Sequence, residues 1–307
     1  MMTPLRLAFA GYQPPGSVHS KSGRLLIERL ASALAGGADL SFDENVTTAG
    51  TPMTSLMPRT AGGEFDMFYI ASSYLAATCP SLGVLDMPFP AWSRRELFAA
   101  LDEGELGRRL RADVAASTPF RLLGFWDNGV RHLSNAVRPI REPSDCVGLR
   151  IRTLDNSLHQ AAFRAMGFDP VFVDMRDFRT AIAEGAVEAQ ENPLTNLVTF
   201  EVCRHHPHVS LTGHFQGVVL MLANAAWFDG LAALVRAALI EALGEATAHQ
   251  RQLALEEDDT CAARLTGEGA RILGPADLDL EQFRASVAPV ADSIVAGLDP
   301  HLRSLIG

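Results

Sequence analysis

The segment GLRIRTLDNSLHQAAFRAMGFDPVFVDMRDFRTAIAEGAVEAQENP (Gly148–Pro193) decides the fold class, because short apolar strands and helices alternate along it. Its pattern predicts strands at 148–152, 170–173 and 187–191, and helices at 156–166 and 176–184. Pro193 then suits the first turn of a further helix. Strands that alternate with helices favour a parallel sheet covered by helices on both faces.

The same alternation continues on both sides of this segment. Before it, we expect strands at 5–10, 40–45, 65–70 and 120–126, and helices at 20–35, 51–59, 94–103 and 105–116. After it, we expect strands at 208–212, 216–222 and 270–273, one or two long helices from Trp227 to about 266, and a final helix at 280–298. No low-complexity linker interrupts the chain. We therefore expect two α/β lobes that share several chain crossings.

Composition narrows the class of protein. The chain has 307 residues, of which 48% are hydrophobic and 20% charged, as in an ordinary soluble globular protein of two domains. Its net charge of -10 argues against a nucleic-acid partner, which would need a basic surface. No apolar run reaches the length of a membrane span, and the first ten residues, MMTPLRLAFA, lack the long apolar region of a signal peptide. On this evidence the chain is cytoplasmic, or it begins at a mature or recloned N-terminus.

The motifs of catalysis and metal binding are not found. The sequence has no G-x-S-x-G, H-E-x-x-H, P-loop or G-x-G-x-x-G motif, and we expect no cofactor. His205, His206 and His208 are spaced irregularly before and after Pro207, which favours an exposed turn over a metal site. The four cysteines form no C-x-x-C pair, and buried thiols are preferred to a Cys203–Cys261 disulfide.

Motifs between Phe125 and His214 carry a resemblance to a known family. They are WDNGVRHLSN (126–135), RPIREPSD (138–145), GLRIR (148–152), GFDP (167–170), FRTAIAEGAVEAQENP (178–193) and VSLTGH (209–214). Shorter matches are GEFDM (63–67), LDMPF (85–89) and LDEGELG (101–107). In order and spacing these motifs resemble the DctP-type solute-binding proteins of TRAP transporters, over most of the chain.

This resemblance implies a fold, a partner and a location. The implied fold is a two-lobed, periplasmic-binding-protein-like α/β clamshell with a long helix spanning both lobes. One lobe would comprise 1–125 plus about 213–250, and the other 126–212 plus about 251–307. The protein would be a periplasmic monomer that captures a small organic carboxylate, such as a sugar acid or a hydroxy or keto acid. It would deliver this ligand to the permease subunits in the membrane.

The resemblance also implies ligand-binding residues. Arg152 matches the family arginine that forms a salt bridge with the ligand carboxylate, and a guanidinium offers two parallel donors to that group. Arg131 and Asn192 match further ligand contacts, and His214 closes the last motif. Asn192 followed by Pro193 also reads as an ordinary helix start.

Three further residues are weaker candidates. Gln13 and Ser72, together with Tyr12, match loops that face the ligand in the family. Asp174 stands where many acid-binding relatives carry an apolar or aromatic residue. It either caps a helix, with Asp177 in the first turn, or places a carboxylate in the pocket beside a ligand hydroxyl or amine.

Two other functions remain open at this level. A sensor of the same fold would report its ligand to a partner, although no signalling or DNA-binding domain is visible in the chain. An enzyme built on the same fold would need a nucleophile with its base, and the sequence nominates none.

Overall fold

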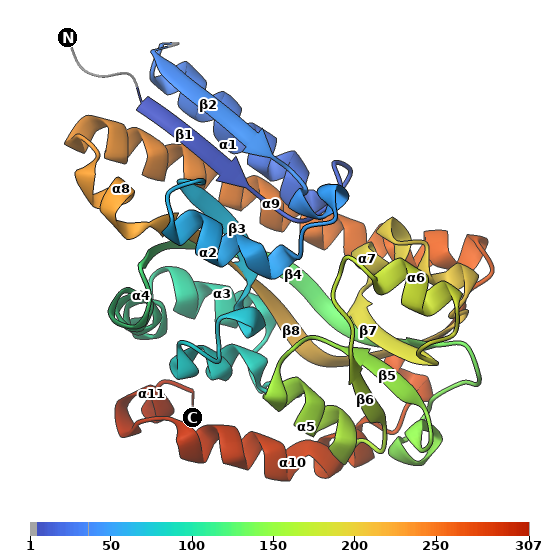
Figure 1. Cartoon of the computed structure of the whole chain (residues 1–307). Helices are drawn as coiled ribbons and strands as arrows, with labels where there is room; N and C mark the ends of the chain where they lie inside the picture. The colour runs from blue at the N-terminus through green and yellow to red at the C-terminus, as the bar shows by residue number, and fades with distance from the viewer. Residues whose placement is uncertain (1–4, 36, 307) are drawn as a thin grey trace.

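The computed structural model describes residues 5–35 and 37–306 and shows a single twisted sheet with helices around it (Figure 1). The strand order is β2-β1-β3-β8-β4-β7-β5-β6, and β9 pairs with β8. The strands are β1 Leu5–Ala10, β2 Ala38–Asp43, β3 Met67–Ala71, β4 Phe120–Asn135, β5 Arg150–Thr153, β6 Asp169–Phe172, β7 Ala189–Pro193, β8 His208–Asn224 and β9 Arg271–Leu273.

The helices follow the predicted positions within a few residues, and most begin at a side-chain cap. Ser93 caps α3 in a reciprocal pair with Glu96, and Asn156 caps α5. The α-helices are α1 Val18–Ala33, α2 Leu56–Ala61, α3 Arg94–Asp102, α4 Glu105–Ser117, α5 Ser157–Ala165, α6 Phe178–Ala183, α7 Leu194–Thr199, α8 Ala225–Gly230, α9 Ala233–Gly267, α10 Leu280–Gly297 and α11 Pro300–Ser304. Two of the 3₁₀ helices position the site, η3 Ser72–Tyr74 and η4 Pro80–Asp86.

The expectation of a parallel sheet is wrong for its centre. β4 and β8 are antiparallel to each other, and each is also antiparallel to one further neighbour, β7 and β3 respectively. β8 joins into one strand the two strands expected at 208–212 and 216–222, and β4 runs nine residues past its predicted end at Trp126. Pairing between segments about 90 residues apart leaves no local pattern, so the alternation of elements could not reveal it.

The two long strands connect separate hydrophobic cores. The first core gathers β1, β3, α1, α3, α4, the first half of β4 and the second half of β8. Leu298 and Leu302 near the C-terminus also pack in it. A second core surrounds α5 and α10, and a third lies among α6, α7, β9 and the end of α9. The proposed lobe boundaries stay a prediction.

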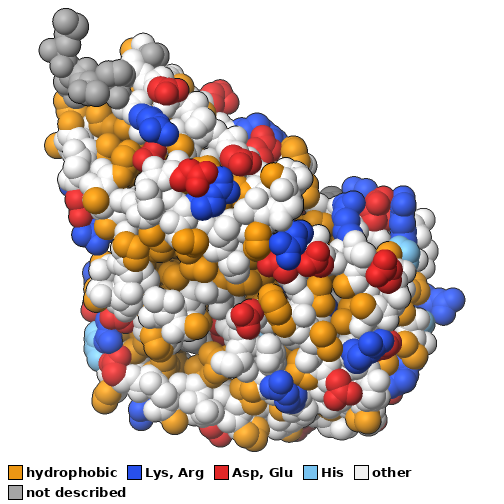
Figure 2. All heavy atoms as spheres, viewed as in Figure 1, with side chains coloured by type: hydrophobic (Ala, Val, Ile, Leu, Met, Phe, Trp, Pro, Cys, Tyr) orange, Lys and Arg blue, Asp and Glu red, His pale blue; other side chains and the backbone are white. Residues whose placement is uncertain are grey.

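The long helix α9 spans the molecule as expected. Leu239 and Leu243 in its first half pack in the first core, whereas Cys261 and Leu265 near its end pack in the third. It lies behind the sheet in Figure 1. Figure 2 shows the opposite face, where acidic and basic side chains are interspersed and the surface is recessed between the upper and the lower right parts. None of the described helices is both long and apolar enough to cross a membrane.

Candidate ligand-binding site

Arg152 is fully buried at the C-terminal end of β5. Its Nε donates to the carbonyl oxygen of Val173 at 2.9 Å, and its guanidinium lies 5.0 Å from the ring centroid of Phe178. Both terminal nitrogens are buried and meet no hydrogen-bond acceptor in good geometry among residues 5–35 and 37–306, although the Tyr74 hydroxyl lies beside the guanidinium. A buried charged donor without an acceptor is costly, so this fork is held ready for an anion.

Arg131 is buried but its charge is already neutralised. Nη2 donates to Oε1 of Glu191 at 2.7 Å, and Nε donates to the other carboxylate oxygen. Burial alone would raise the pKa of Glu191, but the Arg131 guanidinium and the His214 ring outweigh it and hold that pKa well below its usual range. The ion pair therefore adds polar groups to the site without adding net charge.

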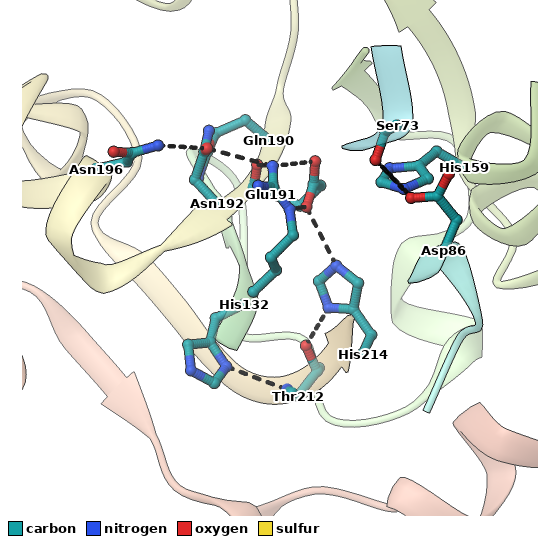
Figure 3. Close-up of polar contacts among 12 residues, drawn as sticks. Ser73, Asp86, His132, His159, Gln190, Glu191, Asn192, Asn196, Thr212 and His214 are labelled. Carbon is teal, nitrogen blue, oxygen red and sulfur yellow. Dashed lines mark hydrogen bonds and ion pairs between the residues drawn. The ribbon is translucent and has the colours of Figure 1, made fainter. Parts of the chain in front are cut away.

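The strand order brings these residues together, because β5 pairs with β7 and β7 pairs with β4. Asn192, on β7, accepts hydrogen bonds from Nδ2 of Asn196 at 3.0 Å and from Arg131 at 3.3 Å, and its own Nδ2 donates to Gln190 at 2.7 Å (Figure 3). This chain of amides fixes the orientation of Asn192. Asn192 is thus a member of a buried network and directly precedes Pro193, which ends β7 and caps α7.

His214 completes the network from β8. Its Nδ1 lies 2.7 Å from Oγ1 of Thr212, and its Nε2 lies 3.5 Å from Oε2 of Glu191 (Figure 3). Burial lowers the pKa of His214, although Glu191 acts in the opposite direction. The ring therefore favours its neutral form, with Nε2 facing the carboxylate of Glu191 that pairs with Arg131.

The first core contributes the facing wall of the site. Burial raises the pKa of Tyr12 and of Tyr74, and the charge of Arg131 acts against that rise at both hydroxyls, as the charge of Arg152 does at Tyr74. Both tyrosines therefore lie close to the arginines of the opposite half. Gln13 is buried, and its Oε1 has no partner in the described part of the chain. Ser72 is also buried and is the first residue of η3, two residues before Tyr74.

Asp174 stands in the turn before α6. Its Oδ1 accepts from the backbone N–H of Arg176 at 2.9 Å, and its carbonyl oxygen accepts from Asp177 at 3.0 Å. The side chain thus closes a turn ahead of α6 and is not the helix cap that was predicted, because α6 begins at Phe178 and its N-cap is Asp177. Its charge also contributes to raising the pKa of Tyr74, so it lies on the same side as the arginines. A direct contact with the ligand stays a prediction.

Ser73, Asp86 and His159 form a buried cluster, but not a catalytic relay (Figure 3). In such a relay the carboxylate holds one ring nitrogen and the serine faces the other. Here Nε2 of His159 faces both Oδ1 of Asp86, at 3.0 Å, and Oγ of Ser73, at 3.4 Å. Nδ1 has no partner within the described ranges, so nothing would orient the ring to activate a nucleophile.

The histidines at 205–208 do not form the exposed turn predicted for them. His205 is exposed, but His206 and His208 are buried, because the chain enters β8 at His208 and packs against the third core. Within the described residues, no group of three or more His, Cys, Asp or Glu side chains is arranged to hold a metal ion. The four cysteines are separate buried thiols.

Sequence reasoning missed Glu191 and Tyr74. Glu191 lies inside the QENP motif, so its position was available, but its ion pair with Arg131 depends on the pairing of β4 with β7. Tyr74 lies two residues after the Ser72 candidate. Only the closeness of the two halves shows that it faces Arg152 and Arg131.

The fold and the site together define a class of protein, namely an α/β binding protein with separate hydrophobic cores and a buried arginine at its binding site. Over residues 9–297 the sequence matches the model of bacterial extracellular solute-binding protein family 7, the DctP family. The chain belongs to this family of TRAP transporter solute-binding proteins, which are binding proteins and not enzymes. The family is extracellular or periplasmic, which confirms the predicted location at that level.

Individual relatives agree with this assignment. A solute-binding protein of Verminephrobacter eiseniae is 31% identical over 74% of this chain and 67% of its own. The 2,3-diketo-L-gulonate-binding periplasmic protein of Escherichia coli is 29% identical over 72% of this chain and 66% of its own. The sugar-acid-binding protein of Advenella mimigardefordensis, solved with galactonate, superimposes with a TM-score of 0.91 at 21% identity, covering 100% of this chain and 97% of its own. The two-lobed fold and its long helix are thereby confirmed.

Proposed function

We propose that the protein binds a small hydroxylated monocarboxylate, such as a sugar acid, and delivers it to the membrane permease of a TRAP transporter. Arg152 binds the carboxylate through its two terminal nitrogens. The observation that carries the proposal is the burial of those nitrogens with no acceptor in the described part of the chain. Arg131, Asn192 and His214 form the polar wall behind the ligand on one side.

The charge balance of the site supports one carboxylate rather than two. Arg131 is paired with Glu191, which leaves Arg152 as the cation whose charge is not met by a carboxylate at hydrogen-bond distance. Of the two arginines placed at the site within the described residues, neither is left for a second ligand carboxylate, and Asp174 lies on the same side. Burying an unpaired carboxylate is unfavourable.

Polar groups from the first core suit a ligand with hydroxyls. Tyr12 and Tyr74 place hydroxyls near the arginines, Ser72 lies near Arg131, and Gln13 is the buried neighbour of Tyr12, so the first core offers donors and acceptors to a ligand. Among similar structures, one was solved with galactonate, one with D-erythronate and one with D-glucuronate, while another was solved with succinate. We infer that this chain belongs with the binders of hydroxylated acids.

A thermal-shift screen with galactonate, D-erythronate, D-glucuronate and succinate tests the proposal. A ligand at 100 times its Kd stabilises a protein by about 2.7 kcal/mol, which corresponds to roughly 5 °C or more for a chain of this size. We expect that shift with at least one hydroxylated acid and a smaller one with succinate. The proposal is wrong if no acid shifts the melting temperature, and its charge argument is wrong if succinate gives the largest shift.

A further inference from the structure

Asp86 is a buried carboxylate that contacts both halves of the molecule. It stands at the end of η4, with 2% of its surface exposed. Its Oδ1 accepts from Oγ of Ser73 and lies 3.0 Å from Nε2 of His159, and its Oδ2 accepts from Nδ2 of Asn156 at 3.0 Å. A single side chain thus joins three partners (Figure 3, where Ser73, Asp86 and His159 are drawn).

These partners belong to different cores. Ser73 and Asp86 lie in segments whose apolar residues, such as Leu75 and Leu85, pack in the first core. Asn156 and His159 begin α5, whose Phe163 packs in the second. Asn156 also donates to the carbonyl oxygen of Ser73 at 2.9 Å. The hydrogen bonds of this cluster therefore connect a segment of the first core to a segment of the second core.

Each end of the cluster is continuous with a wall of the ligand site. Ser73 lies between Ser72 and Tyr74 in η3, so the position of Ser73 fixes both neighbours. Asn156 follows Arg152 by four residues, in the turn that joins β5 to α5. A cavity of about 10 Å³, room for one water molecule at most, lies among Ser72, Asp86, Arg131 and His159. The Asp86 cluster thus lies beside the ligand site, where it can set the distance between η3 and the start of α5.

We propose that Asp86 is a positioning residue, which ties η3 to the start of α5 and thereby sets the geometry at which Tyr74 faces Arg152 and Ser72 lies near Arg131. The proposal rests on the proposed function, since it concerns the same ligand site. In this role Asp86 acts through its protein partners and not by binding the ligand. It acts through Ser73 and Asn156, which are each bonded into a segment that carries ligand-facing residues.

Hydrogen exchange measured without ligand tests the first half of the proposal. In Asp86→Asn one carboxylate oxygen is replaced by an NH2 group, which cannot accept a hydrogen bond from Asn156 or His159. We therefore expect both segments to become less stable. We expect faster exchange at Leu75 and Thr78, whose N–H groups are bonded within or just after η3, and equally at His159 and Gln160 in the first turn of α5. Faster exchange at 72–86 alone would show that Asp86 serves only its own core, and would overturn the proposal.

Affinity measured by calorimetry with galactonate, D-erythronate and D-glucuronate tests the second half. Asn156→Asp keeps the cap of α5, because Asp also caps well, but sets a second carboxylate against Asp86. We expect Asn156→Asp and Asp86→Asn each to weaken binding at least tenfold. The combined variant exchanges carboxylate and amide, so it should bind more tightly than the product of the two single effects.

Asn224→Asp is the matched control. Asn224 caps α8 and donates to the carbonyl oxygen of Thr60, the same pair of roles that Asn156 has, but its contacts stay within the first core. Its affinity should equal that of the wild type. Unchanged affinity in Asp86→Asn and Asn156→Asp, or strictly multiplicative effects in the combined variant, would refute the positioning role. If the wild type binds none of the three acids, the proposed function fails, and hydrogen exchange alone then decides on Asp86.

Discussion

Replacing Arg152 by methionine should abolish binding while leaving the ligand-free protein about as stable as the wild type. Methionine is similar in length and carries no charge. The wild-type residue is fully buried, and both terminal nitrogens lack an acceptor among the described residues. The cost of these buried donors is therefore set against the contacts that the guanidinium makes with Val173 and Phe178.

The expected sizes follow from the contacts of Arg152. Each buried donor left without an acceptor costs about 1–3 kcal/mol, and this penalty disappears in Arg152→Met. Against it stand the lost hydrogen bond to Val173 and the contact with the Phe178 ring, the latter about 0.5–2 kcal/mol. The two sides are of similar size, about 2–6 against about 2–5 kcal/mol, so the free energy of unfolding should stay within about 2 kcal/mol of the wild-type value. In the complex, two bonds to a carboxylate contribute about 1.5–3 kcal/mol each, so their loss weakens binding roughly 100-fold or more.

Urea unfolding without ligand and calorimetry with the tightest-binding acid would measure both effects. Arg150→Met is the matched control, because Arg150 lies on the same strand but is exposed and paired with Glu188. Its affinity should not change. Arg152→Lys should bind poorly as well, since one ammonium cannot reproduce the paired donors. An Arg152→Met variant that binds within a few-fold of the wild type, or that loses several kcal/mol of stability without ligand, would refute this account of Arg152.

Four other perturbations have expected outcomes. Saturating ligand should reduce the radius of gyration in small-angle scattering as the halves close, and identical curves would argue against a clamshell. Arg94→Gln should cost about 3 kcal/mol in urea unfolding, because it leaves the buried carboxylate of Asp127 without its counter-charge. Burial lowers the pKa of His19 and of His206 to about 4. The unfolded chain therefore takes up protons first, and stability, complete above about pH 6.5, should fall by up to about 1.4 kcal/mol per histidine for each pH unit down to pH 4; a flat urea midpoint over that range would contradict it. If Asp174 faces the ligand, Asp174→Asn should increase the thermal shift with succinate relative to that with hydroxylated acids. An unchanged order of the thermal shifts would mean that Asp174 only stabilises the turn before α6.

Much of the secondary structure could be predicted because it depends on local patterns. β1 was expected at 5–10 and is found at Leu5–Ala10, and α9 was expected from the long run of Ala, Leu, Glu and Arg without proline. The strand at 148–152 was found within two residues, with Arg152 near its C-terminal end. These are properties of neighbouring residues, and periodicity reports them directly.

The partners of those elements could not be predicted in the same way. The antiparallel pairing of β4 with β8 joins Phe120 to Asn224, and no property of either segment specifies the other. The burial of His206 likewise depends on segments that are distant in the sequence, around Ser134 and Val187, so its polar sequence surroundings were misleading.

The sequence by itself determined that this chain is an acidic α/β protein of the DctP type, and it identified Arg152 as the carboxylate ligand to test. Only the tertiary structure decided which charges remain available. The sequence alone does not distinguish the charge of Arg131 from that of Arg152. In the structure Glu191 pairs with Arg131 across β4 and β7, whereas the two terminal nitrogens of Arg152 are buried without an acceptor in good geometry in the described chain. The physical reason is that charge compensation acts over a few ångströms in space, whereas the sequence orders residues only along the chain.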